Sequence, residues 1–352
     1  IGFGIIGTGL IAGMHAKALA GIDAAHLVAC LSRDEVRAKQ FAQEHDCAAF
    51  TDISQFLGHH EVDAVSICSP SGAHLQTALA AAAAGKHLFV EKPLEVTIER
   101  CERIIRAADS AGVICAGVFQ SRSLPDVMLI KQALQQGRFG SIVIGDAIVK
   151  WKRLPSYYQD SWHGTGSLDG GGALMNQSIH TIDLMQWLIG PVESVQGFTA
   201  RRAHSDLEVE DTAVATVRFA SGALGTIQGS TAIHPGFERR IEISGTEGSV
   251  VLVGDILQEW VFANSTKADE VIRNRCTVND PELGGASDPA GVGIVGHRRQ
   301  YEDVVAAIVQ GRQPSVDGRA AMSAVAIVLA IYESEKLGRP IAPDISALFG
   351  QE

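Results

Sequence analysis

The sequence lacks the features that would place it in a membrane or on a nucleic acid. No apolar run reaches the roughly 18 residues that a transmembrane helix needs, so we expect no membrane span. The 29 basic and 40 acidic residues give a net charge of -11, whereas nucleic-acid binding relies on clustered Lys and Arg. With 46% apolar and 20% charged residues, the composition is that of an ordinary globular protein, and we expect no nucleic-acid partner.

Cysteine is scarce and follows no recognisable pattern. The six cysteines form no C-x-x-C pair and no zinc-like spacing, so we expect no metal site. Several cysteines lie inside apolar runs, which favours buried free thiols in a reducing compartment. We therefore expect a cytoplasmic protein.

The first third of the chain alternates short apolar runs with helical stretches. Single cores stop growing at about 250 to 300 residues, so a chain of 352 residues predicts two domains. Strand, helix and strand in this order predict an α/β domain with a parallel, doubly wound sheet over residues 1–120. The apolar runs are IGFGIIG, AHLVACLS, DAVSICSP, KHLFVEKP and GVICAGVFQ.

Residues 121–352 follow a different pattern and predict a second domain. A helix near Asp126 to Gln136 precedes at least six strand-like segments separated by glycine, which predict a mainly antiparallel sheet. Asn264 to Gly296 is rich in Gly, Asp, Pro and Asn and predicts a long loop, which is often a lid or an oligomer contact. Two helices, His297 to Gln310 and Gly318 to Lys336, close the chain.

The segment GFGIIGTGLIAG carries a dinucleotide-binding pattern. Gly7, Gly9 and Ala12 have G-x-G-x-x-A spacing between the first strand and a helix. Gly7 permits the tight turn, Gly9 lets a pyrophosphate approach the backbone, and Ala12 lets helix and strand pack closely. The helix N-terminus then faces the anion. The predicted cofactor residues of this turn are Gly7, Thr8, Gly9, Leu10 and Ile11.

The end of the next strand bears on which dinucleotide binds. An acidic residue there would bond the ribose hydroxyls of NAD, but the sequence has Ser32 followed by Arg33. These two residues can receive a 2′-phosphate and stack on adenine, which favours NADP(H). NAD(H) stays open because Asp34 follows directly, and a surface role for Arg33 is the alternative.

The segment HLFVEKPLEV is a short apolar strand that ends at Glu91, Lys92 and Pro93. In an open α/β sheet, ligands bind beyond the carboxyl ends of the strands, where Lys92 lies. A positive group beside the reacting oxygen stabilises the alkoxide character that develops as hydride leaves the carbon. Lys92 is therefore a predicted catalytic residue, with Glu91 orienting it or binding the cofactor. The alternative is a structural lysine at a strand end.

A second group of polar residues lies in GGGALMNQSIHTIDLMQWLIG. Asn176, His180 and Asp183 are separated by four and then three residues, so we expect them on one face of a helix. A lone histidine on a helix is more often structural than catalytic. Three polar residues on one stripe, after a turn of Gly170 to Gly172 that lets another group approach the backbone, favour a catalytic site.

Together these motifs resemble the Gfo/Idh/MocA oxidoreductases, the family of glucose-fructose oxidoreductase and inositol dehydrogenase. The resemblance spans nearly the whole chain. It rests on the glycine turn, SPSGAH at Ser69 to His74, EKP at Glu91 to Pro93, and H-x-x-D at His180 to Asp183. It implies an N-terminal Rossmann domain, a C-terminal α+β domain with a large, mainly antiparallel open-faced sheet, and a nicotinamide cofactor. It also implies a homodimer or homotetramer formed through that sheet.

The resemblance also implies further site residues. The implied cofactor contacts are Ser69, Pro70, Ser71, His74, Glu91, Lys92 and Gln120. The implied substrate contacts are Lys92, Trp162, His163, Asn176, Gln177 and His180. Three of these depart from the family pattern: Asn176 stands where aspartate is frequent, Ser71 replaces an asparagine, and His163 replaces an arginine. The asparagine variant is similar to the subset acting on sugars and nucleotide-sugars.

The expected reaction is the reversible oxidation of a secondary alcohol on a sugar, polyol or nucleotide-sugar. Hydride passes to the nicotinamide while His180 takes the hydroxyl proton, Lys92 polarises the oxygen and Asn176 positions a neighbouring hydroxyl. Two alternatives stay open. One is a regulatory sensor of the same fold that binds dinucleotide and sugar without turnover, and the other is an enzyme whose cofactor never leaves.

Overall fold

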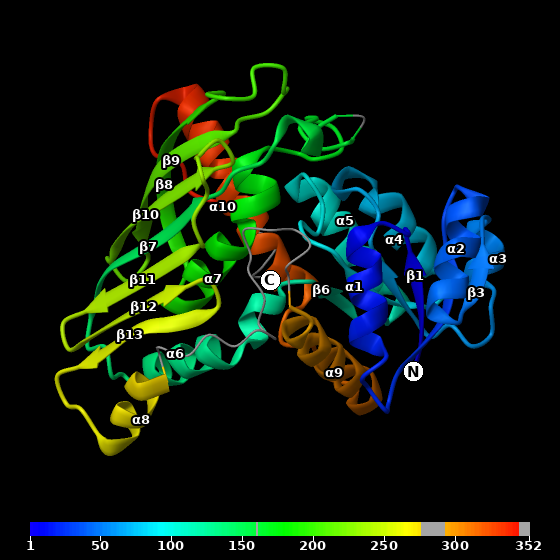
Figure 1. The fold of residues 1–352 in the computed structure, drawn as a ribbon, viewed down its shortest axis with the longest axis horizontal. Coiled ribbons are helices and arrows are strands. Elements are labelled where there is room, and N and C mark those ends of the chain that lie inside the picture. Colours follow the sequence, from blue (N-terminus) through cyan, green and yellow to red (C-terminus); the bar gives the residue numbers. More distant parts are fainter. Residues whose placement is uncertain (160, 276–292, 345–352) are drawn as a thin grey trace. The chain divides into compact units, whose positions relative to one another are not determined.

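The computed structural model describes residues 1–159, 161–275 and 293–344, which form two compact units (Figure 1). Unit 1 consists of residues 1–120 and 294–322. Unit 2 consists of residues 121–293 and the chain from residue 323 onward, as far as they are described. After residue 293 the chain thus returns to unit 1. Unit 1 therefore also contains residues 294–322, which lie in the second of the two domains predicted from the sequence.

Unit 1 is built on a six-stranded sheet whose neighbouring strands all pair in parallel. The strand order is β3-β2-β1-β4-β5-β6, so the direction of winding reverses between β1 and β4. Open α/β sheets bind ligands at such points. The predicted parallel, doubly wound sheet is confirmed. Its strands are β1 (Gly2–Ile6), β2 (His26–Leu31), β3 (Ala48–Phe50), β4 (Ala64–Ile67), β5 (His87–Val90) and β6 (Cys115–Gly117).

Three helices of unit 1 begin at side chains that cap them. Asp34, Asp52 and Thr97 accept hydrogen bonds from the first N–H groups of α2, α3 and α5. These caps occupy N–H groups that would otherwise have no partner. The helices are α1 (Leu10–Leu19), α2 (Glu35–His45), α3 (Ile53–Leu57), η1 (Ser71–Ala73), α4 (His74–Ala83), α5 (Ile98–Ala111) and α9 (Val295–Gln310).

Helix α9 completes the core of unit 1 although it lies late in the chain. Its Tyr301 is fully buried. The ring of Tyr301 packs edge-on against Phe3 of β1 and Phe89 of β5, with centroids 5.0 and 4.8 Å apart. Aromatic pairs in this arrangement add to the stabilisation from burial.

Unit 2 contains a seven-stranded sheet in the order β13-β12-β11-β7-β10-β9-β8. Strands β7 and β10 pair in parallel, and the other neighbours pair antiparallel. The predicted mainly antiparallel sheet is therefore confirmed. Its strands are β7 (Ile142–Lys150), β8 (Val192–Ala200), β9 (Thr212–Phe219), β10 (Leu224–Ser230), β11 (Arg240–Gly245), β12 (Gly248–Val253) and β13 (Ile256–Phe262).

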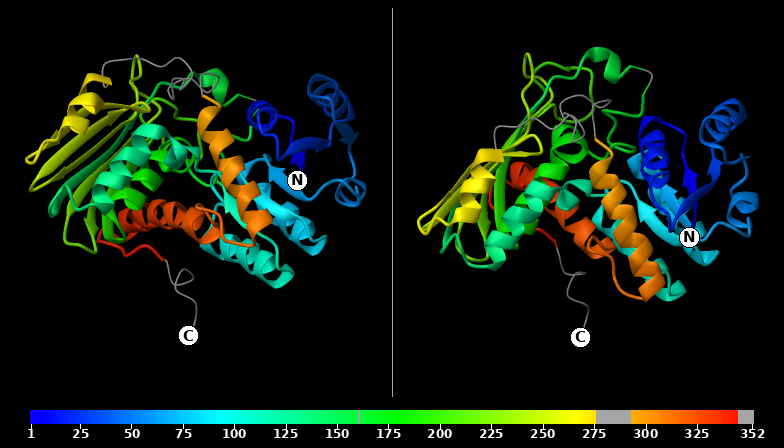
Figure 2. Two further views of the ribbon diagram at one scale, coloured as in Figure 1. Left: turned by 90° about the horizontal axis from the view of Figure 1, so that it is seen from below. Right: turned by 60° about the horizontal axis from the view of Figure 1, so that its bottom comes forward.

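The two faces of this sheet differ. Helices α6 (Pro125–Gln135), α7 (Ile179–Ile189) and α10 (Gly318–Leu337) cover one face, as Figure 2 shows. Along β9, side chains alternate between buried and exposed, as expected for a half-covered sheet. The other face exposes four apolar residues that lie opposite one another as two cross-strand pairs. They are Phe198 with Val214, and Ile144 with Leu224.

The remaining elements correct one prediction. They are η2 (Gln120–Ser123), η3 (Pro155–Tyr157), the π-helical η4 (Ala173–Ser178) and α8 (Lys267–Arg275). The loop predicted from Asn264 to Gly296 is wrong at its start, where α8 forms, and at its end, where α9 begins. Residues 276–292 of that loop lie outside the described residues. The described helices include none with the length and apolar character needed to cross a membrane.

Candidate functional site

The turn between β1 and α1 presents an open helix N-terminus. Gly7 has φ +98°, and a Cβ there would lie 2.7 Å from the carbonyl oxygen of Cys68, so the turn requires glycine. A Cβ on Gly9 would meet nothing within 4 Å, and Gly9 supplies no side-chain cap for α1. The first N–H groups of α1, which begins at Leu10 and Ile11, are therefore suited to an anion such as a pyrophosphate.

Ser32, Arg33 and Asp34 follow β2. Oδ1 of Asp34 accepts hydrogen bonds from the backbone N–H groups of Val36 (2.9 Å) and Arg37 (3.1 Å), which caps α2. Oγ of Ser32 accepts a 3.3 Å bond from the N–H of Asp34. Asp34, the acidic residue that leaves NAD(H) as an alternative cofactor, thus caps helix α2.

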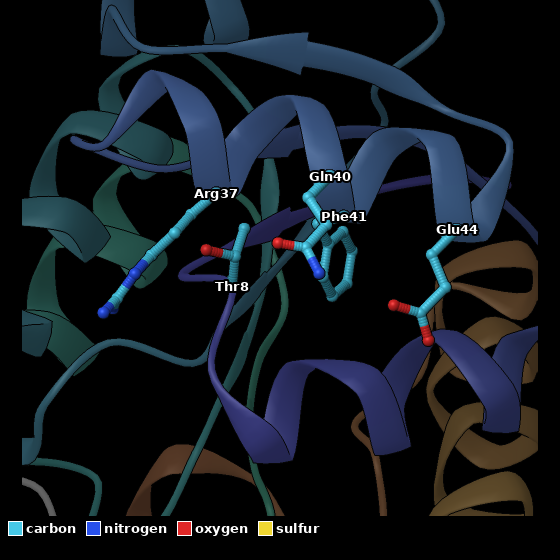
Figure 3. Close-up of a pocket in the computed structure, with 5 residues that line it drawn as sticks. All are labelled: Thr8, Arg37, Gln40, Phe41 and Glu44. Carbon is cyan, nitrogen blue, oxygen red and sulfur yellow. The ribbon is translucent and has the colours of Figure 1, made fainter.

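A hollow of about 230 Å³ is lined by the glycine turn and α2 (Figure 3). The residues that line it are Thr8, Arg37, Gln40, Phe41 and Glu44. Sequence reasoning missed the four α2 residues, although their spacing of i, i+3, i+4 and i+7 places them on one face of a helix. Arg37 is 75% exposed, and its nearest acid is Oδ2 of Asp34 at 3.7 Å. The hollow therefore offers an exposed guanidinium to an anionic ligand.

The loop after β4 carries the predicted contacts Ser69, Pro70 and Ser71. Ser71 is 3% exposed and opens η1. Oγ of Ser69 is buried and makes no hydrogen bond with the described residues, and the same holds for Oε1 of Gln120. Buried polar atoms are normally satisfied, so these two atoms fit a site that binds a ligand.

His74 is buried and bridges two loops. Its Nε2 lies 2.9 Å from the carbonyl oxygen of Ser69, and its Nδ1 lies 3.0 Å from that of Pro93. Burial lowers the pKa of His74, so the ring is neutral and donates from one nitrogen at a time. His74 therefore ties the Ser69 loop to the EKP loop as a support. The Lys92-Pro93 peptide bond in that loop is cis.

Glu91 holds the backbone of Lys92. Its Oε2 accepts a 2.9 Å hydrogen bond from the N–H of Lys92, and its Oε1 lies 2.9 Å from Nε2 of His15. Burial raises the pKa of Glu91, but the hydrogen bond from His15 and the nearby ring of His297 outweigh burial and hold that pKa well below its usual value. Both oxygens of this ionised carboxylate are thus engaged within unit 1, which favours the orienting role over direct cofactor contact.

A chain of buried groups continues from Glu91 to α9. Burial lowers the pKa of His15, so its ring is neutral and Nε2–H donates to Glu91. Nδ1 of His15 must then accept, and it lies 2.6 Å from Oη of Tyr301, which lies 2.6 Å from Oγ of Ser66. Tyr301 therefore donates to His15 and accepts from Ser66. Sequence reasoning missed this chain because His15 and Tyr301 are 286 residues apart.

In unit 2, Gly170 to Gly172 precede the second group of predicted residues. A Cβ on Gly172 would lie 1.6 Å from the carbonyl oxygen of Glu210, and one on Gly171 would lie 2.3 Å from Oη of Tyr332. We expected this turn to admit a group that approaches the backbone. The groups that approach are Glu210 and Tyr332 of the protein itself.

Glu210 anchors the start of η4. Its carboxylate accepts hydrogen bonds from the N–H groups of Gly172 and Leu174, both at 2.9 Å, and from Oη of Tyr332 at 2.8 Å. Burial raises the pKa of Glu210 to about 7, although these three bonds lower it. Glu210 is therefore a buried acid that titrates near neutrality beside the turn leading to Asn176.

The predicted stripe of three polar residues spans two kinds of helix. Asn176 lies in the π-helical η4, and α-helical geometry begins only at Ile179. Regular α-helical spacing therefore applies to His180 and Asp183, which both lie in α7. Asp183 is fully buried and accepts two hydrogen bonds from Arg122, from Nε at 2.8 Å and from Nη2 at 2.5 Å. Asp183 thus anchors α7, whereas His180 is half-buried.

Four predicted substrate contacts of unit 2 form one connected group with Tyr157. Two of them contact Tyr157 directly, and the other two contact His163. His163 stacks on Tyr157 with ring centroids 4.4 Å apart and planes 10° apart. The ring of Trp162 lies 4.0 Å from that of His163, and Nε2 of Gln177 donates to Oη of Tyr157 at 3.4 Å. Nδ2 of Asn176 lies 3.2 Å from Nδ1 of His163. Sequence reasoning missed Tyr157, since no local pattern distinguishes it.

Comparisons with known proteins agree with this architecture. The model of the oxidoreductase family with an NAD-binding Rossmann fold matches residues 1–119, and the model of the GFO/IDH/MocA C-terminal domain matches residues 127–251. The myo-inositol 2-dehydrogenase of Thermotoga maritima is 31% identical over 256 residues, which are 70% of this chain and 73% of that protein. The chain belongs to the Gfo/Idh/MocA oxidoreductase family.

Two further known proteins match nearly the whole chain. The WlbA dehydrogenase from Bordetella pertussis, solved in complex with NADH and UDP-GlcNAcA, is 34% identical with a TM-score of 0.86. That likeness covers 97% of this chain and 96% of WlbA. A 1,5-anhydro-D-fructose reductase from Ensifer adhaerens is 27% identical over 96% of this chain and 97% of its own length. This Gfo/Idh/MocA chain is therefore an NAD-binding oxidoreductase.

One group of side chains in the described part of this Gfo/Idh/MocA chain has the composition of a metal site. Ligand atoms of His15, Glu91 and His297 all lie within 4.8 Å of one another, and zinc sites use such ligands. However, Nε2 of His15 already donates to Oε1 of Glu91, and Nε2 of His297 lies 3.9 Å from the same oxygen. The buried hydrogen-bonded chain accounts for His15 and Glu91, whereas neither ring nitrogen of His297 has a hydrogen-bond partner among the described residues.

Proposed function

We propose that the protein transfers hydride between a nicotinamide dinucleotide and a secondary hydroxyl or keto group of a sugar, polyol or nucleotide-sugar. The observation that carries this proposal is Lys92, which lies just beyond β5 with its backbone held by the buried carboxylate of Glu91. The likeness to WlbA, which was solved with NADH and UDP-GlcNAcA, supports the substrate class. The likeness to a myo-inositol dehydrogenase supports it further.

Each proposed catalytic residue has one task. The bound cofactor supplies the hydride acceptor or donor. Lys92 polarises the reacting oxygen and stabilises its alkoxide character, and His180 takes or returns the hydroxyl proton. Asn176 binds a neighbouring hydroxyl. Because an amide does not exchange protons in this pH range, Lys92 and His180 carry the acid-base work.

We further propose that NADP(H) is preferred over NAD(H). Oδ1 of Asp34 is engaged in capping α2, which weakens the case for an acid that binds ribose hydroxyls. Arg33 is exposed, and Arg37 lines the hollow beside the glycine turn. Two guanidinium groups near Ser32 suit a 2′-phosphate, since arginine binds phosphate through paired hydrogen bonds.

We propose a homodimer or homotetramer formed through the uncovered face of the unit 2 sheet. Phe198 is 75% exposed and Val214, opposite it, is 52% exposed. Exposed apolar clusters on a sheet face are typical of protein interfaces. Light scattering of the wild type and of Phe198→Glu tests this proposal. An unchanged mass for the variant, or a monomeric wild type, would contradict it.

We also propose a cytoplasmic location. The cysteines that the structure describes are all free, and four of them are buried: Cys30, Cys68, Cys101 and Cys115. Burial raises the pKa of Cys68, which keeps that thiol protonated and unreactive. Free thiols of this kind are usual in a reducing compartment.

The test of the proposed reaction is a substrate panel. The purified protein is mixed with NADP⁺ or NAD⁺ and with sugars, polyols and UDP-sugars, and the absorbance of the reduced nicotinamide is followed. Turnover of at least one of these compounds supports the proposal. Tight dinucleotide binding that responds to a sugar without any turnover would instead favour a sensor. Nucleotide that stays bound through purification and couples two sugars would indicate a resident cofactor.

A further inference from the structure

His297 is a fully buried histidine whose ring has no hydrogen-bond partner among the described residues. It lies near the start of α9 and is 0% exposed, and neither Nδ1 nor Nε2 is satisfied there. Buried polar groups are normally hydrogen-bonded, because leaving one unpaired costs free energy. An imidazole in this state calls for an explanation, such as a bound ion.

Two other potential metal ligands lie beside this ring. Nε2 of His297 is 3.9 Å from Oε1 of Glu91, and the same oxygen is 2.9 Å from Nε2 of His15. Ligand atoms of the three residues all lie within 4.8 Å of one another, and all three side chains are buried. They belong to α9, to the residue after β5 and to α1, which all lie in unit 1. The fold of unit 1 therefore brings two imidazoles and one carboxylate to one place.

We propose that His15, Glu91 and His297 bind a zinc ion that fastens α1, the EKP loop and α9 together inside unit 1. Two imidazoles and one carboxylate are a ligand set that zinc uses, whereas calcium and magnesium prefer sites built from oxygen atoms. A water molecule takes the fourth position, as in other zinc sites with three protein ligands. The ion is structural. No step of the proposed hydride transfer uses it, and the inference does not rest on that reaction.

The distances between the ligand atoms fit zinc after a small adjustment. Zinc bonds nitrogen and oxygen at about 2.0 to 2.2 Å, so two ligand atoms of a tetrahedral site lie about 3.3 Å apart. The separations of 2.9 and 3.9 Å lie on either side of that value. Movement of the His297 ring toward the other two ligands breaks no hydrogen bond to the described residues. The site therefore needs only side-chain adjustment.

The groups behind the ligands also suit a metal. A histidine that binds a metal usually donates from its other ring nitrogen, and a carboxylate ligand is itself hydrogen-bonded. Nδ1 of His15 lies 2.6 Å from Oη of Tyr301, which lies 2.6 Å from Oγ of Ser66. Oε2 of Glu91 accepts from the N–H of Lys92. Zinc on Nε2 of His15 would move the ring proton to Nδ1, so that His15 donates to Tyr301 and Tyr301 donates to Ser66.

Spacing along the chain does not predict this site. The expectation that the protein has no metal site came from the cysteines, and zinc motifs in a sequence usually place their ligands a few residues apart. His15 and Glu91 are 76 residues apart, and His297 lies in the part of the chain that returns to unit 1 after residue 293. The proposed site therefore replaces that expectation.

The first test measures zinc in the purified protein. Protein made without a histidine tag in zinc-supplemented medium and passed over a chelating resin should retain about one zinc ion per chain by elemental analysis. His297→Leu removes one ligand at similar side-chain volume and should retain almost no zinc. The control is the double variant His59→Ala/His60→Ala, because these two stacked histidines, of which His60 is exposed, could bind zinc adventitiously. The control should retain as much zinc as the wild type.

Thermal unfolding measures what the ion does for unit 1. Zinc that binds only the folded protein stabilises it, so zinc at about 100 times its Kd should raise the unfolding midpoint of the metal-free wild type by about 5 °C or more. The control double variant should respond equally, and His297→Leu should not respond. Without metal, His297→Leu should unfold at or above the wild-type midpoint, because an apolar side chain replaces an unpaired buried imidazole.

Cobalt(II) gives a readout on the wild type that needs no variant. It occupies zinc sites and absorbs visible light strongly when four-coordinate, so the metal-free wild type should show these bands on titration and lose them when zinc is added. A wild type that neither retains zinc nor binds added zinc or cobalt overturns the inference. Zinc that His297→Leu keeps also overturns it, because the ion then lies elsewhere in the protein. Loss of that zinc in His59→Ala/His60→Ala would identify it as an adventitious surface ion.

Discussion

The backbone N–H of Lys92 donates a 2.9 Å hydrogen bond to Oε2 of Glu91, the residue before it. The other oxygen of this carboxylate faces Nε2 of His15 on α1. Because α1 begins at the glycine turn, one buried anion connects the predicted cofactor turn with the predicted catalytic lysine. Four predictions follow from this support and from the sites around it.

Glu91→Gln should lower kcat by about tenfold or more, because one acceptor oxygen cannot serve both the N–H of Lys92 and Nε2–H of His15. Dinucleotide affinity should change only a few-fold, since both oxygens of Glu91 already have partners within unit 1. Steady-state kinetics and equilibrium binding of the dinucleotide measure the two effects. Glu99→Gln, at an exposed position in the first turn of α5, is the control. A large loss of affinity at unchanged kcat would show that Glu91 binds the cofactor.

Lys92→Ala and His180→Ala should each lower turnover by about a hundredfold or more, the range of general acid-base groups. Both variants should still bind dinucleotide, because the glycine turn is untouched. Lys86→Ala serves as the control, since Lys86 precedes β5 and donates to the carbonyl oxygen of Val62. Near-normal turnover in both variants would refute the proposed mechanism.

Arg37→Ala should raise KM for NADPH by about tenfold, the equivalent of one charged hydrogen bond, and leave KM for NADH nearly unchanged. The reason is that the additional phosphate of NADPH needs a cation in the hollow. Lys39→Ala removes another exposed cation from α2, where it pairs with Glu35, and should affect neither value. Equal effects of Arg37→Ala on both cofactors would contradict the proposed NADP(H) preference.

Glu210 should make unit 2 less stable as pH rises through neutrality. Burial raises the pKa of Glu210 to about 7, above its value in the unfolded chain, so the folded state binds the proton more tightly. The resulting stabilisation is complete below about pH 4.5 and is lost as pH rises through 7. It amounts to roughly 3 kcal/mol.

Urea unfolding between pH 5 and 8 measures this effect in the wild type and in Glu210→Gln. As pH rises, the unfolding free energy of the wild type should fall relative to that of Glu210→Gln. A difference that does not vary with pH would show that Glu210 is ionised throughout this range.

The features that could be predicted from sequence depend on residues adjacent in the chain. Gly7 is required by a local φ of +98°, and alternation of strand and helix follows from hydrophobic periodicity. The stripe of Asn176, His180 and Asp183 was an inference of the same local kind. It assumes α-helical spacing throughout, whereas η4, which contains Asn176, adopts π-helical geometry where Glu210 binds the N–H groups of Gly172 and Leu174.

The sequence by itself determined the two kinds of sheet, the glycine turn and the position of a lysine after a buried strand, because each depends on backbone preferences and periodicity within a few residues. Only the tertiary structure decided how Glu91 supports Lys92, how Tyr301 reaches His15, and how Glu210 anchors the start of η4. These contacts join groups whose polar atoms find partners only after the chain has packed. No local pattern records such pairings, since burial creates them.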